Sequence, residues 1–173
     1  MDELKLVRPS RALREQAEAY RREFFDHGEK EINGSAQLGL LDFDRWLERV
    51  EGDARVARPD WTVVDTFFAV REEDGAVVGT LEVRHRLETE YLARYAGNIG
   101  YSVRPSQRRR GYATRMMELA LDHARHLGLS EVMVGCYTDN IPSRKVIEHH
   151  GGRLREVKPY LNGKPMYVFW ISL

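Results

Sequence analysis

The sequence predicts a single α/β (α+β) domain spanning residues 1–173, with six to seven strands flanked by about four helices. Short apolar runs of strand length alternate with segments in which apolar residues recur at the spacing of one helical face. Two turn signals, Asp74–Gly75 and Asn162–Gly163, each join two apolar runs and predict antiparallel hairpins. A chain of 173 residues is long enough to bury a substantial core in one domain.

The composition excludes several classes of partner. Lysine plus arginine equals aspartate plus glutamate at 27 residues each, so there is no global basic field and we expect no nucleic-acid partner. Cys136 is the only cysteine, which excludes an intrachain disulfide. The N-terminus lacks the apolar core of a signal peptide, and no apolar run reaches membrane-spanning length. We therefore expect a cytoplasmic protein that does not bind a membrane.

The N-terminal half is predicted to form a strand over residues 4–7, a helix capped by Ser10, a loop over 26–40, a second helix from about Asp42 and a loop over 52–60. The apolar residues of both helices recur at helical spacing, which predicts packing against a sheet rather than chemistry. These residues are Leu13, Ala17, Tyr20, Phe24, Phe43, Trp46, Leu47 and Val50.

The first hairpin is predicted over residues 63–70 and 76–86. Its polar and apolar residues alternate imperfectly, which is typical of a sheet covered on both faces. The connector that follows, from Leu87 to about Gly97, is polar and aromatic and longer than a simple turn. Connectors of this length in compact domains are often functional, so we expect it to contribute to a binding site.

Residues 99–128 are predicted to form a strand, a glycine turn and a helix. The apolar run 99–103 predicts a buried strand, which Pro105 ends because proline has no backbone N–H. A helix then runs to Gly128, with its apolar face formed by Ala113, Met116, Met117, Ala120, Ala124 and Leu127.

The turn before this helix has the features of an anion site. The first turn of a helix carries unpartnered N–H groups and partial positive charge. Gly111 lets an anion approach the backbone closely, and Arg108, Arg109 and Arg110 add cationic charge. The turn matches neither G-x-G-x-x-G nor G-x-x-x-x-G-K-[ST]. It predicts a phosphate or pyrophosphate site, with a solvated arginine run as the alternative.

The C-terminal part is predicted to form a strand over residues 131–137, a helix capped by Asn140 that ends at Gly151, and a second hairpin over 153–160 and 166–171.

Two motifs at fixed spacing carry a family resemblance. The first, [QR]-x-x-G-x-[GA] preceded by Val-x-Pro, is matched by Arg108, Gly111 and Ala113 after Val103 and Pro105. The second, Asn-x-x-[Ala/Ser] followed by a helix-ending glycine, is matched by Asn140, Ser143 and Gly151. Over residues 99–152 the chain therefore resembles the GNAT superfamily of N-acetyltransferases. It is most similar to a bacterial group without an assigned substrate that carries Arg-His-Arg-Leu and Val-Ile-Glu, here residues 84–87 and 146–148.

The resemblance implies the GNAT acyl-CoA N-acyltransferase fold, an α/β (α+β) fold with a mixed, mostly antiparallel sheet whose fourth and fifth strands splay apart. The implied cosubstrate is acetyl-CoA, whose pantetheine arm fills the gap as an added strand would. Backbone groups of Tyr101 and Val103 would bind the acetyl-pantetheine, and Asn140 would bind the pantetheine arm. The cofactor-binding candidates are Tyr101, Ser102, Val103, Arg108, Arg109, Arg110, Gly111, Tyr112, Ala113, Thr114, Asn140, Ser143 and Arg144.

The implied activity is transfer of an acetyl group to a primary amine by direct attack, with backbone N–H groups near Tyr101 stabilising the oxyanion. The candidate bases are His85 and Glu88, acting through water. The alternative for His85 is a structural hydrogen bond to Glu82 or Glu88. Many members of the family place a tyrosine, as general acid, where this chain has Ile147. The remaining candidate acids are Tyr101 and Tyr137.

The acceptor is expected to be a small-molecule or peptide amine bound by loops 26–40 and 85–97, and the protein to be a monomer or a homodimer. Because the usual tyrosine is missing, a second function stays open: a coenzyme A-binding sensor or module with little turnover. Cys136, in an apolar strand, is predicted to be a buried apolar residue rather than a nucleophile. No metal is expected, because the histidines lack convergent partners at metal-ligand spacing.

Overall fold

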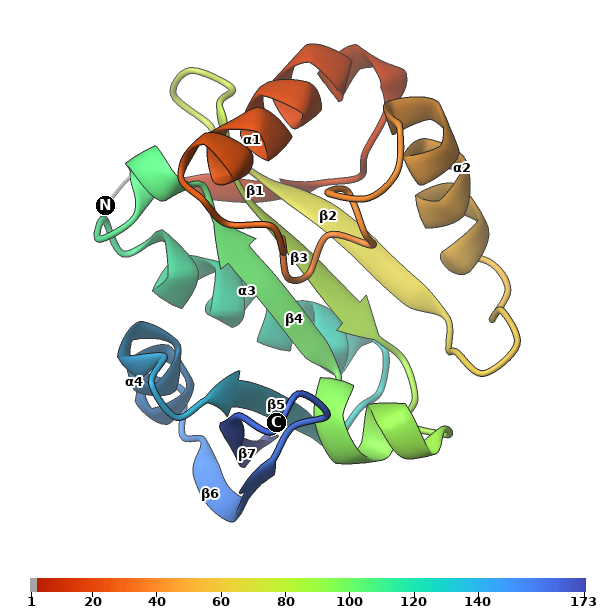
Figure 1. Cartoon of the computed structure of the whole chain (residues 1–173). Coiled ribbons are helices and arrows are strands. Elements are labelled where there is room, and N and C mark those ends of the chain that lie inside the picture. The colour runs from red at the N-terminus through yellow and green to blue at the C-terminus, as the bar shows by residue number, and fades with distance from the viewer. Residues whose placement is uncertain (1–2) are drawn as a thin grey trace.

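The computed structural model describes residues 3–173, which fold into seven strands in two antiparallel sheets (Figure 1). The first sheet has the order β1-β2-β3-β4 and the second β5-β7-β6. The strands are β1 (Leu4–Val7), β2 (Val64–Arg71), β3 (Val77–Arg84), β4 (Ile99–Val103), β5 (Glu131–Tyr137), β6 (Arg153–Pro159) and β7 (Pro165–Ser172). All seven strands and both hairpins expected from the sequence are present, so the predicted fold class is confirmed.

Four α-helices and three short helical turns complete the described fold. The α-helices are α1 (Arg14–Asp26), α2 (Phe43–Asp53), α3 (Tyr112–His126) and α4 (Ile141–His149). The short elements are two 3-10 turns, η1 (Arg11–Leu13) and η3 (Pro105–Gln107), and one π-helical turn, η2 (Leu92–Ala96), which lies in the connector between β3 and β4. Ser10 precedes η1 without a side-chain capping bond, so the predicted cap is wrong.

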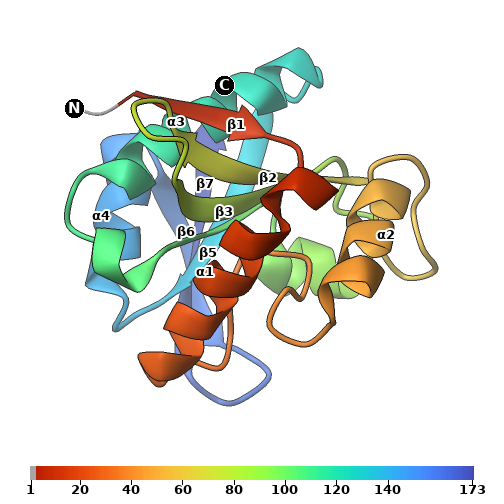
Figure 2. The same cartoon turned by 90° about the horizontal axis from the view of Figure 1, so that it is seen from above.

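Helices cover both faces of the four-stranded sheet (Figures 1 and 2). α1 and α2 pack on one face through Tyr20, Phe24 and Trp46, whereas the apolar stripe of α3 packs on the other. β3 is buried along its whole length and β2 at every residue except Arg71, as the imperfect alternation predicted. The core beneath α3 continues into β5 and β7, so the two sheets share one apolar interior.

β4 and β5 lie next to each other but are joined at one end only. Asn98 N donates to Met133 O at 2.8 Å, and Met133 N donates to the Asn98 side-chain Oδ1 at 2.9 Å. Across the described residues, no strand pairing follows beyond this joint, and the two strands belong to different sheets. The splay that the family resemblance implied is therefore present.

The register of β3 and β4 decides which backbone groups face the splay. The β3–β4 pairing is bracketed by hydrogen bonds from Arg104 N to Val78 O (2.8 Å) and from Arg84 N to Asn98 O (2.7 Å). Bonded and non-bonded residues alternate along an antiparallel pair. The N–H and C=O groups of Tyr101 and Val103 consequently point away from β3, toward the gap between the sheets.

Candidate active site

The turn before α3 is built as a nest of backbone N–H groups. Gly111, at the N-cap of the helix, has φ +83°. Arg109 has φ +64°, a left-handed conformation that a non-glycine residue rarely adopts and that clusters at functional sites. Along residues 3–173 no backbone acceptor pairs with the N–H groups of Arg109, Arg110, Gly111, Ala113 or Thr114. These donors, with the helix dipole behind them, form a site that fits a diphosphate.

A groove of about 580 Å³ runs from this turn toward the gap between β4 and β5. Loop 27–41 contributes its other wall. Most of the predicted cofactor-binding residues line it: Tyr101, Ser102, Val103, Arg108, Arg109, Gly111, Tyr112, Ala113, Thr114, Asn140 and Ser143. Arg110 and Arg144 are outside it; both are exposed, and Arg144 pairs with Glu148 at 2.8 Å.

The three arginines of the turn do not act alike. The Arg108 guanidinium is held by both carboxylate oxygens of Glu29, at 2.6 and 2.9 Å, and its Nε donates to Val103 O at 3.1 Å. Arg108 thus ties the turn to loop 27–41, and its hydrogen bond lowers the pKa of Glu29. Arg109 and Arg110 are exposed. The exposed arginines leave the main-chain N–H groups as the donors nearest to a bound phosphate. The C=O of Val103, expected to bind the acetyl-pantetheine, already accepts from Arg108.

A smaller cavity of about 210 Å³, the junction cavity, opens where the groove meets the gap. Tyr101, Asn140 and Ser143 line both spaces. The Tyr101 hydroxyl lies 2.7 Å from the Ser143 Oγ, and Asn140 Oδ1 caps α4 by accepting from Ser143 N. Burial raises the pKa of Tyr101 to about 12, so this phenol keeps its proton at neutral pH. Asn140 retains its side-chain amide N–H groups for a ligand.

Three further candidates take different positions. Cys136 is buried, and burial raises the pKa of its thiol to about 11, which disfavours a thiolate nucleophile. Tyr137 lines the junction cavity, and its hydroxyl accepts from Asn162 Nδ2 at 3.0 Å. The Ser102 Oγ lies 3.0 Å from both the Tyr20 hydroxyl and the Thr80 Oγ1, so this side chain braces α1 against the sheet.

His85 and Glu88 lie away from the cavities. The His85 Nε2 is 2.8 Å from Asp65 Oδ2, which the His123 Nε2 also contacts at 2.8 Å. The prediction that Glu82 or Glu88 is the hydrogen-bond partner of His85 is wrong, because the β2–β3 register places Asp65 of β2 beside the end of β3. Glu88 is exposed and pairs with Arg86 at 3.1 Å. Neither residue lines the groove or the cavities that hold the other candidates.

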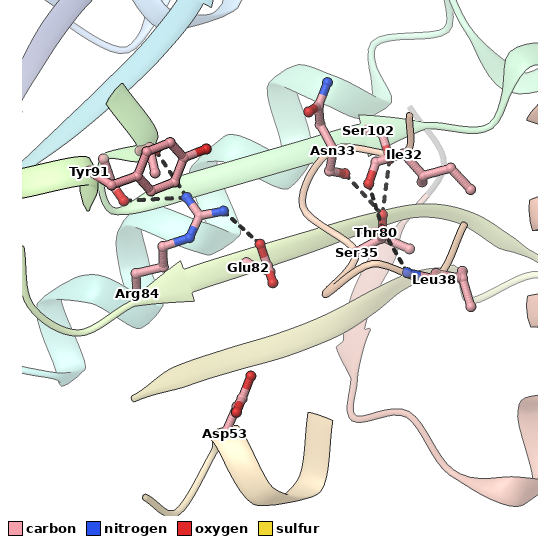
Figure 3. Close-up of polar contacts among 12 residues, drawn as sticks. Ile32, Asn33, Ser35, Leu38, Asp53, Thr80, Glu82, Arg84, Tyr91 and Ser102 are labelled. Carbon is pink, nitrogen blue, oxygen red and sulfur yellow. Dashed lines mark hydrogen bonds and ion pairs between the residues drawn. The ribbon is translucent and has the colours of Figure 1, made fainter. Parts of the chain in front are cut away.

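An outer cavity of about 650 Å³ adjoins the junction cavity and contains residues that the sequence analysis did not select. Its floor is the β3 pair of Glu82 and Arg84, whose Oε2 and Nη2 are 2.7 Å apart (Figure 3). Glu31 and Asn33 of loop 27–41 line all three spaces. The sequence contained a signal for this floor, because Glu82 and Arg84 are charged, stand at alternate positions of a strand and therefore share one face of the sheet.

Loop 27–41 lies directly against β4 because Gly34 of the loop and Gly100 of the strand have no side chains to hold the two backbones apart. A Cβ built on Gly34, which has φ +65°, would lie 2.2 Å from Gly100 O. Loop residues Ala36 and Gln37, which line the outer cavity, also have positive φ values of 51° and 65°. Backbone strain of this kind persists where the surrounding structure imposes it. The contact with β4 and the positive φ values therefore indicate that loop 27–41 has a defined conformation where it lines the cavities.

Between residues 3 and 173, no group of three or more metal-ligating side chains converges. In the same span no helix has the length and apolarity needed to cross a bilayer.

Comparisons with known proteins agree on one family. A model of the acetyltransferase (GNAT) domain matches residues 11–153. No curated protein matches the sequence. A protein from Bordetella pertussis described as a GnaT-family acetyltransferase has a similar structure, with a TM-score of 0.71 and 20% identity, over 99% of this chain and 97% of the other.

Two other solved structures share the fold at similar TM-scores and sequence identities. The microcin C7 self-immunity acetyltransferase MccE, solved with acetyl-CoA and AMP, has a TM-score of 0.71 and 15% identity, over 100% of this chain and 94% of the other. The spermidine/spermine N-acetyltransferase SpeG from Vibrio cholerae has a TM-score of 0.68 and 15% identity, over 98% and 93%. The domain match spans most of the chain, and the chain belongs to the GNAT acetyltransferase family.

Proposed function

We propose that this chain transfers the acetyl group of acetyl-CoA to a primary amine by direct attack. The observation that carries the proposal is the gap between β4 and β5, which continues the groove from the N–H nest before α3. The nest residues from Arg109 to Thr114 would hold the diphosphate, and the free backbone groups of Tyr101 would pair with the pantetheine arm.

In this arrangement the thioester reaches the junction cavity. The backbone N–H of Tyr101, which faces the gap, would stabilise the oxyanion of the tetrahedral intermediate. The Tyr101 hydroxyl would donate a hydrogen bond to the sulfur as the thiolate leaves. A phenol with a pKa of about 12 is a weaker acid than a thiol at about 8.5, so its role is to stabilise negative charge, and water completes the protonation.

The acceptor amine would enter from the outer cavity. Glu82 is the buried carboxylate there, and it replaces His85 and Glu88 as the proposed proton acceptor because those two lie outside the cavity. Neighbours of this fold supply precedents for amine acceptors: SpeG is a spermidine/spermine N-acetyltransferase. Holding both reactants in adjoining cavities would supply much of the rate through proximity.

Calorimetry with acetyl-CoA and a thiol-release assay over a panel of amines, amino acids and peptides test this proposal. We expect acetyl-CoA to bind and free thiol to appear only when an acceptor is present. Binding without acceptor-dependent thiol across the panel would favour the second candidate, a coenzyme A-binding sensor, which Ile147 at the usual tyrosine position supports. Absence of acetyl-CoA binding would refute both.

A further inference from the structure

We infer that the acceptor is an α-amino acid with a free carboxylate, which rests on the proposed function. Arg84 would bind its carboxylate and Glu82 its ammonium group. The two side chains offer a zwitterion one group of each sign, side by side on the floor of the outer cavity.

The position of the pair is set by strand alternation. Glu82 and Arg84 lie on the face of β3 that loop 27–41 covers, and they are only 5% and 8% exposed. Two carbonyl oxygens, those of Ala96 and Gly97, accept from Arg84 Nη1 at 3.0 and 3.3 Å. The main chain thus holds one side of the guanidinium before any ligand arrives, which restricts its orientation toward a planar carboxylate.

The contacts of Glu82 and Arg84 within the protein leave some of their hydrogen-bonding atoms without a partner. Arg84 Nε is buried without a hydrogen-bond partner in the described structure. The ion pair with Arg84 uses Glu82 Oε2 only, and no hydrogen bond to Oε1 is found among residues 3–173; Arg84 Nε is thus the one atom of the pair that is buried and unpartnered there. Buried polar groups are nearly always satisfied in proteins, so an exception at a cavity floor calls for a ligand or a function. A carboxylate and an ammonium group would satisfy one atom each after a small adjustment of the two side chains.

The Glu82 carboxylate and the Arg84 guanidinium both lie next to the segment of β4 where the thioester would bind. Glu82 is the β3 partner of Gly100, and a Cβ on Gly100 would lie 3.0 Å from Arg84 Nη2. The absence of a side chain at Gly100 is what admits the guanidinium there. An amine held by Glu82 is therefore beside Tyr101, whose free N–H faces the gap.

The charges and rings around the cavity favour an anionic group over a second cation. The cationic side chains that line it are Lys30, Arg49, Arg58 and Arg84, against Glu31 and Glu82. Arg58 is already paired with the buried Asp53 at 2.6 Å, and cations still outnumber carboxylates when Asp53 is counted. The Trp61 ring, which is the obvious platform for a ligand cation, already faces Arg84 and Arg58 at 5.7 and 5.8 Å. A polyamine would meet more positive than negative charge. The amino-acid side chain would lie in the outer part of the cavity, near Trp61 and Leu40.

The reaction balances with these groups alone. The ammonium group of the amino acid gives one proton to the Glu82 carboxylate, which passes it to solvent. The nitrogen lone pair then attacks the thioester carbon, a C–N bond forms and the C–S bond breaks. Sulfur leaves with the bonding electrons as thiolate and takes up a proton, while nitrogen loses its second proton. The products are an N-acetyl amino acid, coenzyme A and one proton released.

The test compares each amino acid with its α-amide and with its decarboxylated amine on the unmodified protein. We expect kcat/KM to fall by about 10²-fold or more when the carboxylate is removed, because the charged site is then left unpaired. In Arg84→Gln the acid should lose its advantage over the amide. The matched control is Arg86→Gln, two positions further along, where the side chain is exposed and paired with Glu88 outside the cavities.

Several outcomes would overturn the inference. Amides or plain amines that react as fast as the acids would exclude carboxylate recognition. If Arg84→Gln lowers kcat/KM equally for the amino acid and its α-amide, Arg84 has a structural role and does not bind the carboxylate. If Arg84→Gln does not fold, as thermal unfolding would reveal, the substrate comparison on the unmodified protein decides alone. Failure of acetyl-CoA to bind, or of any amine to react, would instead refute the proposed function.

Discussion

The contact between Gly34 and Gly100 makes a sharp prediction about the wall of the site. In Gly34→Ala, the new Cβ would lie 2.2 Å from Gly100 O, whereas non-bonded heavy atoms prefer about 3.5 Å. Loop 27–41 must then retreat from β4 by about 1 Å or more. A displacement of that size at a reacting centre costs about 10²-fold in rate, so we expect kcat/KM for the acceptor to fall by about 10²-fold.

The same loop provides a matched control. Gly28 also has a positive φ, +80°, but a Cβ there meets nothing within 4 Å. Both substitutions share the left-handed strain of about 1–2 kcal/mol, which lowers the melting temperature of a protein this size by about 2–8 °C. Only Gly34→Ala adds the clash. Gly28→Ala should therefore lose stability and keep its kcat/KM.

The assay is acceptor-dependent thiol release, with the fastest-reacting amine of the panel, beside thermal unfolding of each variant. Acetyl-CoA affinity from calorimetry is measured in parallel, because Glu29, Glu31 and Asn33 of the same loop line the groove. Unchanged kcat/KM in Gly34→Ala, or an equal loss in Gly28→Ala, would show that close seating of the loop on β4 does not shape the site.

Three other predictions test separate parts of the structure. Gly111→Val places a β-branched residue at φ +83° and should raise the acetyl-CoA Kd by about 10-fold or more in calorimetry, whereas Gly128→Val, at φ +79° at the other end of α3, should leave it unchanged. Asp65→Asn should lower the melting temperature more at pH 7 than at pH 3. Burial raises the pKa of the Asp65 carboxyl, but the hydrogen bonds from its two histidines and its arginine outweigh burial and lower the pKa below the unfolded value of about 3.9. The stabilisation is therefore present above about pH 4 and lost as the pH falls through the folded pKa, and equal losses at both pH values would contradict this account. Tyr101→Phe should lower kcat by about 10-fold or more at unchanged acetyl-CoA affinity; an unaltered kcat would exclude the proposed hydrogen bond to sulfur.

The elements and most residues of the groove before α3 followed from local sequence. Alternation and helical spacing predicted every strand and α-helix, since these patterns record which side of each segment faces the core. The glycine and arginine turn predicted an anion site for an equally local reason, because a helix N-terminus carries unpartnered N–H groups wherever it lies. The structure placed most of the predicted cofactor residues in one groove.

The positions of the catalytic candidates depended on long-range pairing, which the sequence did not give; Tyr101 and Tyr137 line the junction cavity, whereas His85 and Glu88 do not. His85 was a reasonable base by residue type, but the β2–β3 register puts it on Asp65, beside His123 of α3. Glu82 and Arg84 were not selected as site residues, although their shared face was readable from the alternation. Nothing local marks Gly34, whose role arises only from its contact with Gly100.

The sequence by itself determined the family, the order of elements and the glycine and arginine turn before α3, because each depends on residues close together in the chain. The tertiary structure alone decided which side chains line the outer cavity, where we propose that the acceptor binds. That choice depends on strand register and on where loop 27–41 rests, and both are settled by packing between segments tens of residues apart.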